Sequence, residues 1–247
     1  HFNVPLLYRR PFVVTIHDII PLLYPGSKIG KSWLRRRCFY WVFQSALSHA
    51  RAIIAVSENT KKDVCEHFSV SPEKIKVIYE GVPHAAGATN VSPALPFLAP
   101  YILYTGVLRE HKNVSGLVKA FIQLVREGRD IRLVIAGPVD HAYGEPRRLW
   151  EEAGLSERVI VKELLTDEEL GHVFASAAVV VVPSFYEGFG FVGLEAMSYG
   201  VPVVASRVAS LPEILGDAAL YFDPHSIEEM VFAIASVLDD PSVTKDL

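Results

Sequence analysis

Short runs of β-branched and apolar residues recur along the chain, and segments with helical periodicity separate them. In Val114–Glu127 the apolar residues fall on one stripe of a 3.6-residue repeat, as in a helix that packs on a sheet. Strands that alternate with helices favour an α/β fold of parallel sheets covered on both faces. The predicted strands are Phe12–Ile16, Ala52–Val56, Ile75–Tyr79, Tyr101–Thr105, Ile131–Ala136, Val159–Val161, Val179–Val182, Pro202–Ala205 and Ala219–Phe222.

Residues 84–99 break this alternation, because they are rich in proline and alanine and show no period. We interpret them as an interdomain linker. Residues 100–247 then hold enough strands for a complete Rossmann-like lobe, whereas residues 1–83 hold a partial α/β lobe. We therefore expect the first lobe to be incomplete at its N-terminus. A second copy of the chain, in a homodimer, is the simplest partner for the sheet edge that would be left open.

Composition places the chain among ordinary globular proteins. It has 247 residues, of which 50% are hydrophobic and 21% charged, and its formal net charge is −4, so no global positive field favours nucleic acid as a partner. Cys38 and Cys65 have no metal-type spacing and are predicted to be reduced, packed thiols. No apolar run approaches the ~20 residues of a membrane span, so the predicted location is cytoplasmic.

The segment Pro183–Met197 carries the strongest chemical signal. It follows an apolar strand, contains three glycines within six residues, and leads into a helix. Such a turn lets backbone N–H groups approach a ligand, and the helix N-terminus adds positive charge, so the segment favours an anion. In an open parallel sheet it also lies outside the carboxyl ends of the strands, where ligands bind.

Two carboxylates, Glu187 and Glu195, stand eight positions apart around this turn and can face the same crevice. A ligand that carries hydroxyls as well as phosphates would suit both features, because carboxylates accept hydrogen bonds from sugar hydroxyls. The alternative is structural: Glu187 caps the helix and Glu195 lies in solvent.

The sequence EGFGFVGLEAMSYGVPVVAS, which begins at Glu187, closely resembles the signature of retaining GT-B glycosyltransferases of family 4, the bacterial mannosyltransferase-like group 1. Further segments resemble the same family in the expected order. Three positions depart from its pattern: Glu80 stands where the family usually has Asn, Val107 where it often has Arg directly after the glycine, and Glu163 where it often has Gly in the loop Lys162–Asp167. The further matching segments are Val14–Asp18, Ala55–Val64, Ile78–Val82 and Tyr104–Asn113.

This resemblance implies a deep cleft between two Rossmann-like lobes, and it gives roles to residues on both. Glu195 would bind the ribose hydroxyls of a nucleotide and Glu187 the hydroxyls of the transferred sugar. His17, at a strand end, would hydrogen-bond the donor sugar beside the reacting carbon. The expected catalytic residues are His17 and Glu187, and the expected donor-binding residues are Arg109, Lys112, Gly190, Phe191, Val192 and Glu195.

The leaving diphosphate develops negative charge that must be stabilised. The sequence contains no Asp-x-Asp motif, and we interpret Asp239-Asp240 as the C-terminal cap region of a helix. Lys112, Arg109 and the helix N-terminus near Phe191 would then stabilise the charge without a metal, as the family resemblance also implies. We expect no cofactor, and a UDP- or GDP-linked sugar as the donor.

Two further features are a basic, aromatic helix in the first lobe and a serine that precedes the next helix. The helix Ser32–His49 is basic and aromatic, so it could lie on the inner face of a membrane, where a lipid-linked acceptor would be found. The favoured interpretation is a packed helix whose arginines extend their charges to water. Ser57 is predicted to cap the helix that follows it.

The resulting hypothesis is a hexosyltransferase that acts on a glycan or lipid-linked acceptor with retention, as in polysaccharide biosynthesis. A glycogen-synthase-like glucosyltransferase and a catalytically inactive nucleotide-binding module are the alternatives. With a partial first lobe, the chain is expected to bind nucleotide and to transfer sugar poorly.

Overall fold

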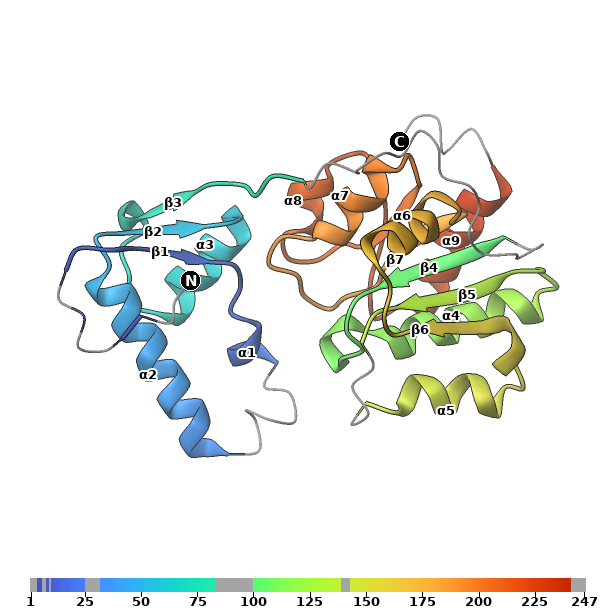
Figure 1. The fold of residues 1–247 in the computed structure, drawn as a ribbon, viewed down its shortest axis with the longest axis horizontal. Helices are drawn as coiled ribbons and strands as arrows, with labels where there is room; N and C mark the ends of the chain where they lie inside the picture. Colours follow the sequence, from blue (N-terminus) through green and yellow to red (C-terminus); the bar gives the residue numbers. More distant parts are fainter. Residues whose placement is uncertain are drawn as a thin grey trace. The chain divides into compact units, whose positions relative to one another are not determined.

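The computed structural model describes residues 4–5, 8, 10–24, 32–82, 100–138 and 143–240. The chain forms two compact units, which are coloured by sequence in Figure 1. The predicted linker, residues 84–99, lies outside the described residues, so the domain boundaries stay a prediction. The first unit comprises His1–Gly81, Tyr186–Gly190 and Ala209–Ile214, and the second Val82–Phe185, Phe191–Val208 and Leu215–Leu247.

The first unit contains a three-stranded parallel sheet in the order β1-β2-β3. Its strands are shorter than predicted by one or two residues at their ends, but each overlaps its prediction. The elements are β1 (Val13–Ile16), α1 (Ile20–Leu23), α2 (Trp33–His49), β2 (Ala52–Ala55), α3 (Glu58–His67), the 3-10 helix η1 (Pro72–Lys74) and β3 (Ile75–Val77).

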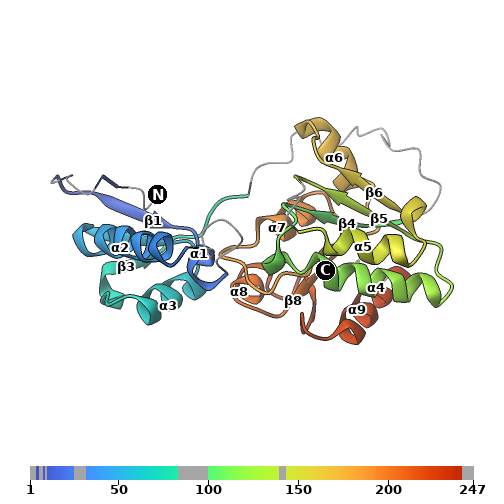
Figure 2. The same cartoon turned by 90° about the horizontal axis from the view of Figure 1, so that it is seen from below.

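Helices cover one face of this sheet, as Figure 2 shows for α2 and α3. Val14 and Ile53 are fully buried against Phe43 of α2 and Val64 of α3, whereas Val13 on the other face is 56% exposed. The prediction of coverage on both faces is therefore wrong for this sheet, within the described residues. The chain advances from β1 to β3 in one direction, and right-handed crossovers then place both helices on the same side. The homodimer expected at the sheet edge stays a prediction.

The second unit contains a six-stranded parallel sheet in the order β6-β5-β4-β7-β8-β9. The chain starts at the centre with β4, moves outward to β6, and returns to β7 beside β4 before it moves outward in the opposite direction. The strands are β4 (Tyr101–Thr105), β5 (Arg132–Ala136), β6 (Val159–Lys162), β7 (Val179–Val182), β8 (Val203–Ser206) and β9 (Leu220–Phe222).

This reversal places helices on both faces of the second sheet, as predicted. Figure 2 shows α4, α5 and α9 on one face and α6 and α7 on the other. The helices are α4 (Val114–Arg126), α5 (Glu145–Glu152), α6 (Asp167–Ala175), α7 (Phe191–Ser198), α8 (Leu211–Leu215) and α9 (Ile227–Asp239), with the 3-10 helices η3 (Glu110–Lys112) and η4 (Ser156–Arg158).

Helix α4 anchors the core of the second unit. Its predicted apolar stripe is buried, with Leu117 and Phe121 fully inaccessible, and it packs against Met230 and Ile234 of α9. The burial of this stripe holds the start of α4, and the loop before it, in a fixed position relative to the sheet.

Smaller predictions have mixed outcomes. Helix α9 ends at Asp239 with Asp240 as its cap, as expected. Both cysteines are free thiols, but Cys38 is exposed rather than packed. Across the described residues, no helix is both long and apolar enough to cross a membrane.

Candidate functional site

The strand order of the second unit indicates a candidate position for a ligand site. β4 and β7 are neighbours at the sheet's centre, with Ile102 opposite Val179, although the chain leaves them in opposite directions. At such a switch point, the loops after the two strands diverge at the carboxyl edge, and ligands bind there in doubly wound folds. The loop after β4 contains Arg109 and Lys112, and the loop after β7 begins the glycine-rich segment.

A backbone hydrogen bond joins these two loops directly. The N–H of Phe185, which follows β7, donates to the carbonyl of His111 at 2.8 Å. The ring of Phe185 also stacks on His225, which precedes α9, at 4.9 Å between centroids. The glycine-rich segment therefore starts beside the residue that precedes Lys112 in sequence.

Asn113 fixes the end of the β4 loop. Its backbone is left-handed, with φ of 51°, a conformation that Asn tolerates better than most residues. Its Oδ1 accepts the N–H of Gly116 at 3.2 Å and caps α4, while its Nδ2 donates to the carbonyl of Pro224 at 3.0 Å. Lys112 lies directly before this buried anchor and is partly buried, whereas Arg109 is exposed. The position of Lys112 is therefore more restricted by its surroundings than the position of Arg109.

The turn at Gly188 packs against the end of β1. A Cβ at position 188 would overlap the carbonyl oxygen of His17 and lie 2.8 Å from the Cβ of Asp18, so only glycine fits. Gly190 adopts a φ of 100°, a conformation that also favours glycine. The turn that carries Glu187 therefore lies against the residue that follows β1, within the first unit.

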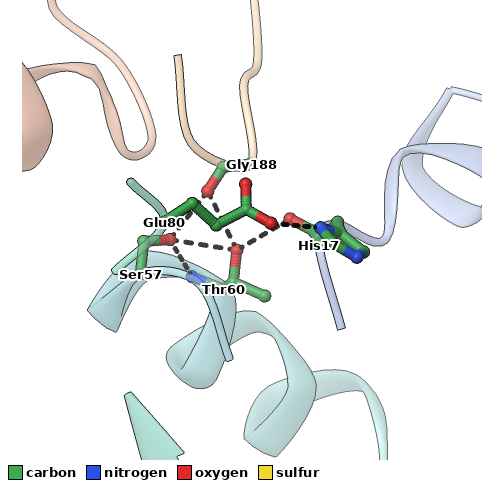
Figure 3. A network of polar contacts seen from close by, with 5 residues as sticks. All are labelled: His17, Ser57, Thr60, Glu80 and Gly188. Carbon is green, nitrogen blue, oxygen red and sulfur yellow. Dashed lines mark hydrogen bonds and ion pairs between the residues drawn. The ribbon is translucent and has the colours of Figure 1, made fainter. Parts of the chain in front are cut away.

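Two buried hydroxyls hold this turn, as Figure 3 shows. The Oγ of Ser57 donates to the carbonyl of Gly188 at 2.8 Å, and the Oγ1 of Thr60 lies 3.2 Å from the same oxygen and 3.4 Å from the carbonyl of His17. Ser57 also accepts the N–H of Thr60 at 3.0 Å, which confirms it as the cap of α3. The same serine thus starts the helix and fixes the turn.

Further side chains fasten the same loop to α3. The hydroxyl of Tyr186 donates to the carboxylate of Asp63, which also accepts the Nδ2 of Asn59 at 2.8 Å. Burial is the main cause that raises the pKa of Asp63 above its usual range, and it also raises the pKa of Tyr186. The loop around Glu187 is therefore held by a partly buried polar cluster and not by its backbone alone.

Helix α8 and the residue before it make further contacts in the first unit, and one of them lies at the start of α3. The carboxylate of Glu213 accepts the backbone N–H groups of Glu58 and Asn59 at 2.6 and 3.0 Å. The hydroxyl of Ser210 donates to the carbonyl of Glu187 at 2.9 Å. Glu213 thus satisfies two of the unpaired N–H groups that every helix start leaves open.

Glu195, on α7, is partly buried and does not lie in open solvent, which argues against the structural alternative for it. Burial, followed by repulsion from Asp167 at the start of α6, raises the pKa of Glu195 above its usual range. Phe191 at the start of α7 is 40% exposed, and Val192 is partly buried. The Glu195 carboxylate on α7 therefore interacts electrostatically with the start of α6.

The predicted residues divide between the units. Glu187 and Gly190 belong to the first unit with His17, although they come from the C-terminal half of the sequence. A single cleft that contains residues of both groups stays a prediction. The residues in the second unit are Arg109, Lys112, Phe191, Val192 and Glu195.

Sequence reasoning missed Tyr186, Asp63 and Glu213. Their contacts join residues more than 100 positions apart, and no local period reports such pairs. The sequence does contain a signal for Thr60, because Ser57 and Thr60 form a polar pair shortly after a buried strand. Both residues are fully buried in the structure.

Comparison with known proteins identifies the family. Residues 94–247 match the family model for glycosyl transferases group 1, and residues 2–86 match that for glycosyltransferase family 4. The chain belongs to the glycosyl transferases group 1 family. The resemblance found in the sequence is therefore confirmed.

Curated relatives of this glycosyltransferase family member include mannosyltransferases. The chain is 32% identical to O-antigen chain mannosyltransferase B of Escherichia coli, over 98% of this chain and 65% of that protein. It is 31% identical to the MMP alpha-(1->4)-mannosyltransferase of Mycolicibacterium hassiacum, over 94% of this chain and 57% of that protein. The chain thus spans less than two thirds of the length of these relatives.

Solved structures confirm the α/β GT-B fold class. Sucrose-phosphate synthase from Thermosynechococcus elongatus is 26% identical with a TM-score of 0.77, over 97% of this chain and 61% of that one. HepE from Anabaena, solved in complex with UDP and glucose, is 23% identical with a TM-score of 0.75, over 96% of this chain and 64% of that one.

Substitution of Gly188 tests the packing of the turn. Gly188→Ala should lower the free energy of unfolding of the first unit by about 1–3 kcal/mol, because the new Cβ forces the turn away from His17. Gly81→Ala is the matched control: nothing lies within 4 Å of its added Cβ, so its effect should stay within about 0.5 kcal/mol. Urea denaturation measures both, and equal stabilities would contradict the packing described above.

The raised pKa of Glu195 predicts a pH dependence of nucleotide binding. As pH falls through this raised pKa, the carboxylate gains a proton and loses acceptor capacity, so affinity should fall at a higher pH than an ordinary glutamate would allow. Titration calorimetry of the wild type and of Glu195→Gln separates this effect from protonation of the phosphates, which both proteins share. Identical pH profiles for the two would exclude a role for the Glu195 carboxylate.

Proposed function

We propose that this chain binds a nucleotide-diphosphate sugar and transfers its hexose to a glycan or lipid-linked acceptor. Transfer would proceed with retention of the anomeric configuration and without a metal ion. The observation that carries the proposal is the junction at the β4–β7 switch point, where the Phe185–His111 hydrogen bond joins the Lys112 loop to the glycine-rich loop. This junction supports a diphosphate site in the family to which the chain belongs.

The charge of the diphosphate would be stabilised by groups already held in place. Lys112 is the last residue of the 3-10 helix η3 and precedes the buried Asn113, so little reorganisation would accompany its use. The N-terminus of α7 adds the partial positive charge of its unpaired N–H groups beside Phe191 and Val192. Fixed cationic groups of this kind stabilise a leaving group whose charge grows in the transition state.

The two glutamates would bind hydroxyls at different parts of the donor. Glu195 would accept hydrogen bonds from the ribose, and Glu187, on the turn against His17, would accept them from the transferred sugar. His17 would hydrogen-bond the same sugar near the reacting carbon. We assign no covalent nucleophile, and the role proposed for Glu187 is to bind and orient.

The curated relatives suggest the sugar. Two of them are named as mannosyltransferases, at 32% and 31% identity, so mannose is the hexose that we propose first. The base remains open between uridine and guanosine, and we propose that no cofactor takes part.

A binding panel tests the proposal and the assigned roles. The wild type should bind UDP or GDP, and the matching nucleotide sugar, equally well with and without EDTA. Glu195→Ala should weaken the bare nucleotide by roughly 1.5–3 kcal/mol, because a charged hydrogen bond is lost. Glu187→Ala should weaken the nucleotide sugar by a similar amount and leave the bare nucleotide unchanged. Titration calorimetry measures all of these affinities.

Other outcomes of the panel would favour other functions. A strict need for Mn²⁺ or Mg²⁺ would mean that a metal, and not Lys112, neutralises the diphosphate. Binding of the nucleotide sugar without hydrolysis or transfer, in a protein as long as the curated relatives, would favour an inactive binding module. Selective use of a glucose donor with an α-glucan acceptor would favour a glycogen-synthase-like enzyme.

We also infer that α2 contacts an anionic membrane surface, where a lipid-linked acceptor would be found. Trp33, Leu34 and Trp41 are 70%, 63% and 62% exposed, which is unusual for large apolar residues on one helix. Exposed arginines at positions 35–37 lie among them, and the guanidinium of Arg37 lies 5.0 Å from the centroid of the Trp33 ring. Exposed aromatic residues can enter the interfacial region of a membrane, and the arginines can attract anionic headgroups.

Vesicle flotation tests this contact. The wild type should float with vesicles that contain phosphatidylglycerol and should stay in solution with phosphatidylcholine alone. Trp41→Ala should reduce the floated fraction, because it removes an exposed aromatic anchor. Phe232→Ala, which removes a 76% exposed aromatic from α9, is the control and should not change it. Equal flotation of both variants would contradict a specific role for α2.

A further inference from the structure

His17 and Glu80 form a pair across the end of the first sheet. The Nδ1 of His17 lies 2.7 Å from the Oε1 of Glu80. His17 directly follows β1, whereas Glu80 follows β3, and β2 lies between these strands. The pair therefore spans three strand ends above the start of α3, as Figure 3 shows.

The backbone of the same histidine is held as well. Its carbonyl faces Gly188, where no side chain fits, and lies 3.4 Å from the hydroxyl of Thr60. The hydroxyl of Thr60 and the close packing of Gly188 hold the main chain on one side, and Glu80 holds the ring on the other. The imidazole position is therefore set relative to the turn that carries Glu187.

A contribution to folding stability does not explain why His17 and Glu80 are paired. The side chain of His17 is 50% exposed, and that of Glu80 is 21% exposed. Ion pairs at such exposure contribute little to folding, because solvent screens the charges. A contact of this length between fixed strand ends instead determines which nitrogen of the His17 ring carries the hydrogen.

A carboxylate is an acceptor only, so Nδ1 of His17 must carry the hydrogen in this contact. In the neutral imidazole, Nε2 then holds the lone pair. Figure 3 shows this second ring nitrogen on the side of the ring away from Glu80. An amide at position 80, as the family resemblance leads one to expect, could donate or accept and would not select between the two tautomers.

We propose that Glu80 is a positioning residue for sugar recognition: it holds the His17 ring in the Nδ1–H tautomer, so that Nε2 accepts a hydrogen bond from a hydroxyl of the donor sugar. The proposal rests on the proposed function, because it assumes that His17 contacts the sugar. It assigns Glu80 no contact with the substrate and requires no proton transfer.

The ¹⁵N NMR spectrum of the His17 ring tests the first half without any ligand. At a pH where the ring is neutral, the wild type should show a pyrrole-like Nδ1 and a pyridine-like Nε2. Glu80→Gln should shift both signals toward a mixture of tautomers, and Glu80→Asp should restore part of the selection. Glu73→Gln, at an exposed position of the same unit, is the control and should leave the spectrum unchanged. An unchanged spectrum in Glu80→Gln would overturn the proposal.

Binding tests the second half. Glu80→Gln should weaken the nucleotide sugar by about tenfold, the effect of impairing roughly one hydrogen bond, and should change the affinity for the bare nucleotide less than twofold. In a His17→Ala background, Glu80→Gln should have no further effect, since Glu80 acts through His17. Equal losses for both ligands, or a full additional loss in the double variant, would overturn the proposal. Failure of the wild type to bind any nucleotide sugar would instead overturn the proposed function, and the tautomer result would still stand.

Discussion

The pairing of β4 with β7 determines which loops lie next to each other at the centre of the second sheet. Those two strands meet at the centre of the second sheet although the chain between them builds β5 and β6 first. Their loops consequently start side by side. A backbone bond between Phe185 and His111 preserves that proximity beyond the ends of the strands. The loop that contains Lys112 and the residue Phe185 after β7 lie together because of this one adjacency.

In the first unit, polar contacts position a turn that comes from the distant part of the sequence. The carbonyls of Gly188 and His17 face the hydroxyls of Ser57 and Thr60, and Tyr186 is fastened to Asp63. Polar groups as buried as these destabilise a fold unless they are paired, so the cluster admits few alternative arrangements. The backbone around Glu187 is thus held by Ser57, by residues of α3 and by Ser210.

The local sequence pattern predicted much of the fold, because strands and turns depend on residues that are close together in the sequence. Each predicted strand coincides with an observed one, since β-branched residues suit a pleated, buried backbone. The glycine-rich turn could be predicted because its backbone requires glycine: no Cβ fits at Gly188, and Gly190 has a positive φ. Coverage of the first sheet was misjudged because crossover direction is a property of the topology. Contacts such as Glu213 to the start of α3 could not be predicted, because both partners look like ordinary surface residues in sequence.

Two hydroxyl hydrogens on Ser57 and Thr60 serve more acceptor oxygens than they can satisfy at once. Ser57 can donate to Gly188 or to Thr60, and Thr60 to Gly188 or to His17. Both side chains have no solvent-accessible surface, a burial at which apolar residues are normally the better choice for stability. A core redesigned only for packing would place Ala or Val at these positions. Such a protein could keep its helices and strands and yet leave two carbonyls unpaired at the turn, so these positions restrict sequence variation in a way that burial alone conceals.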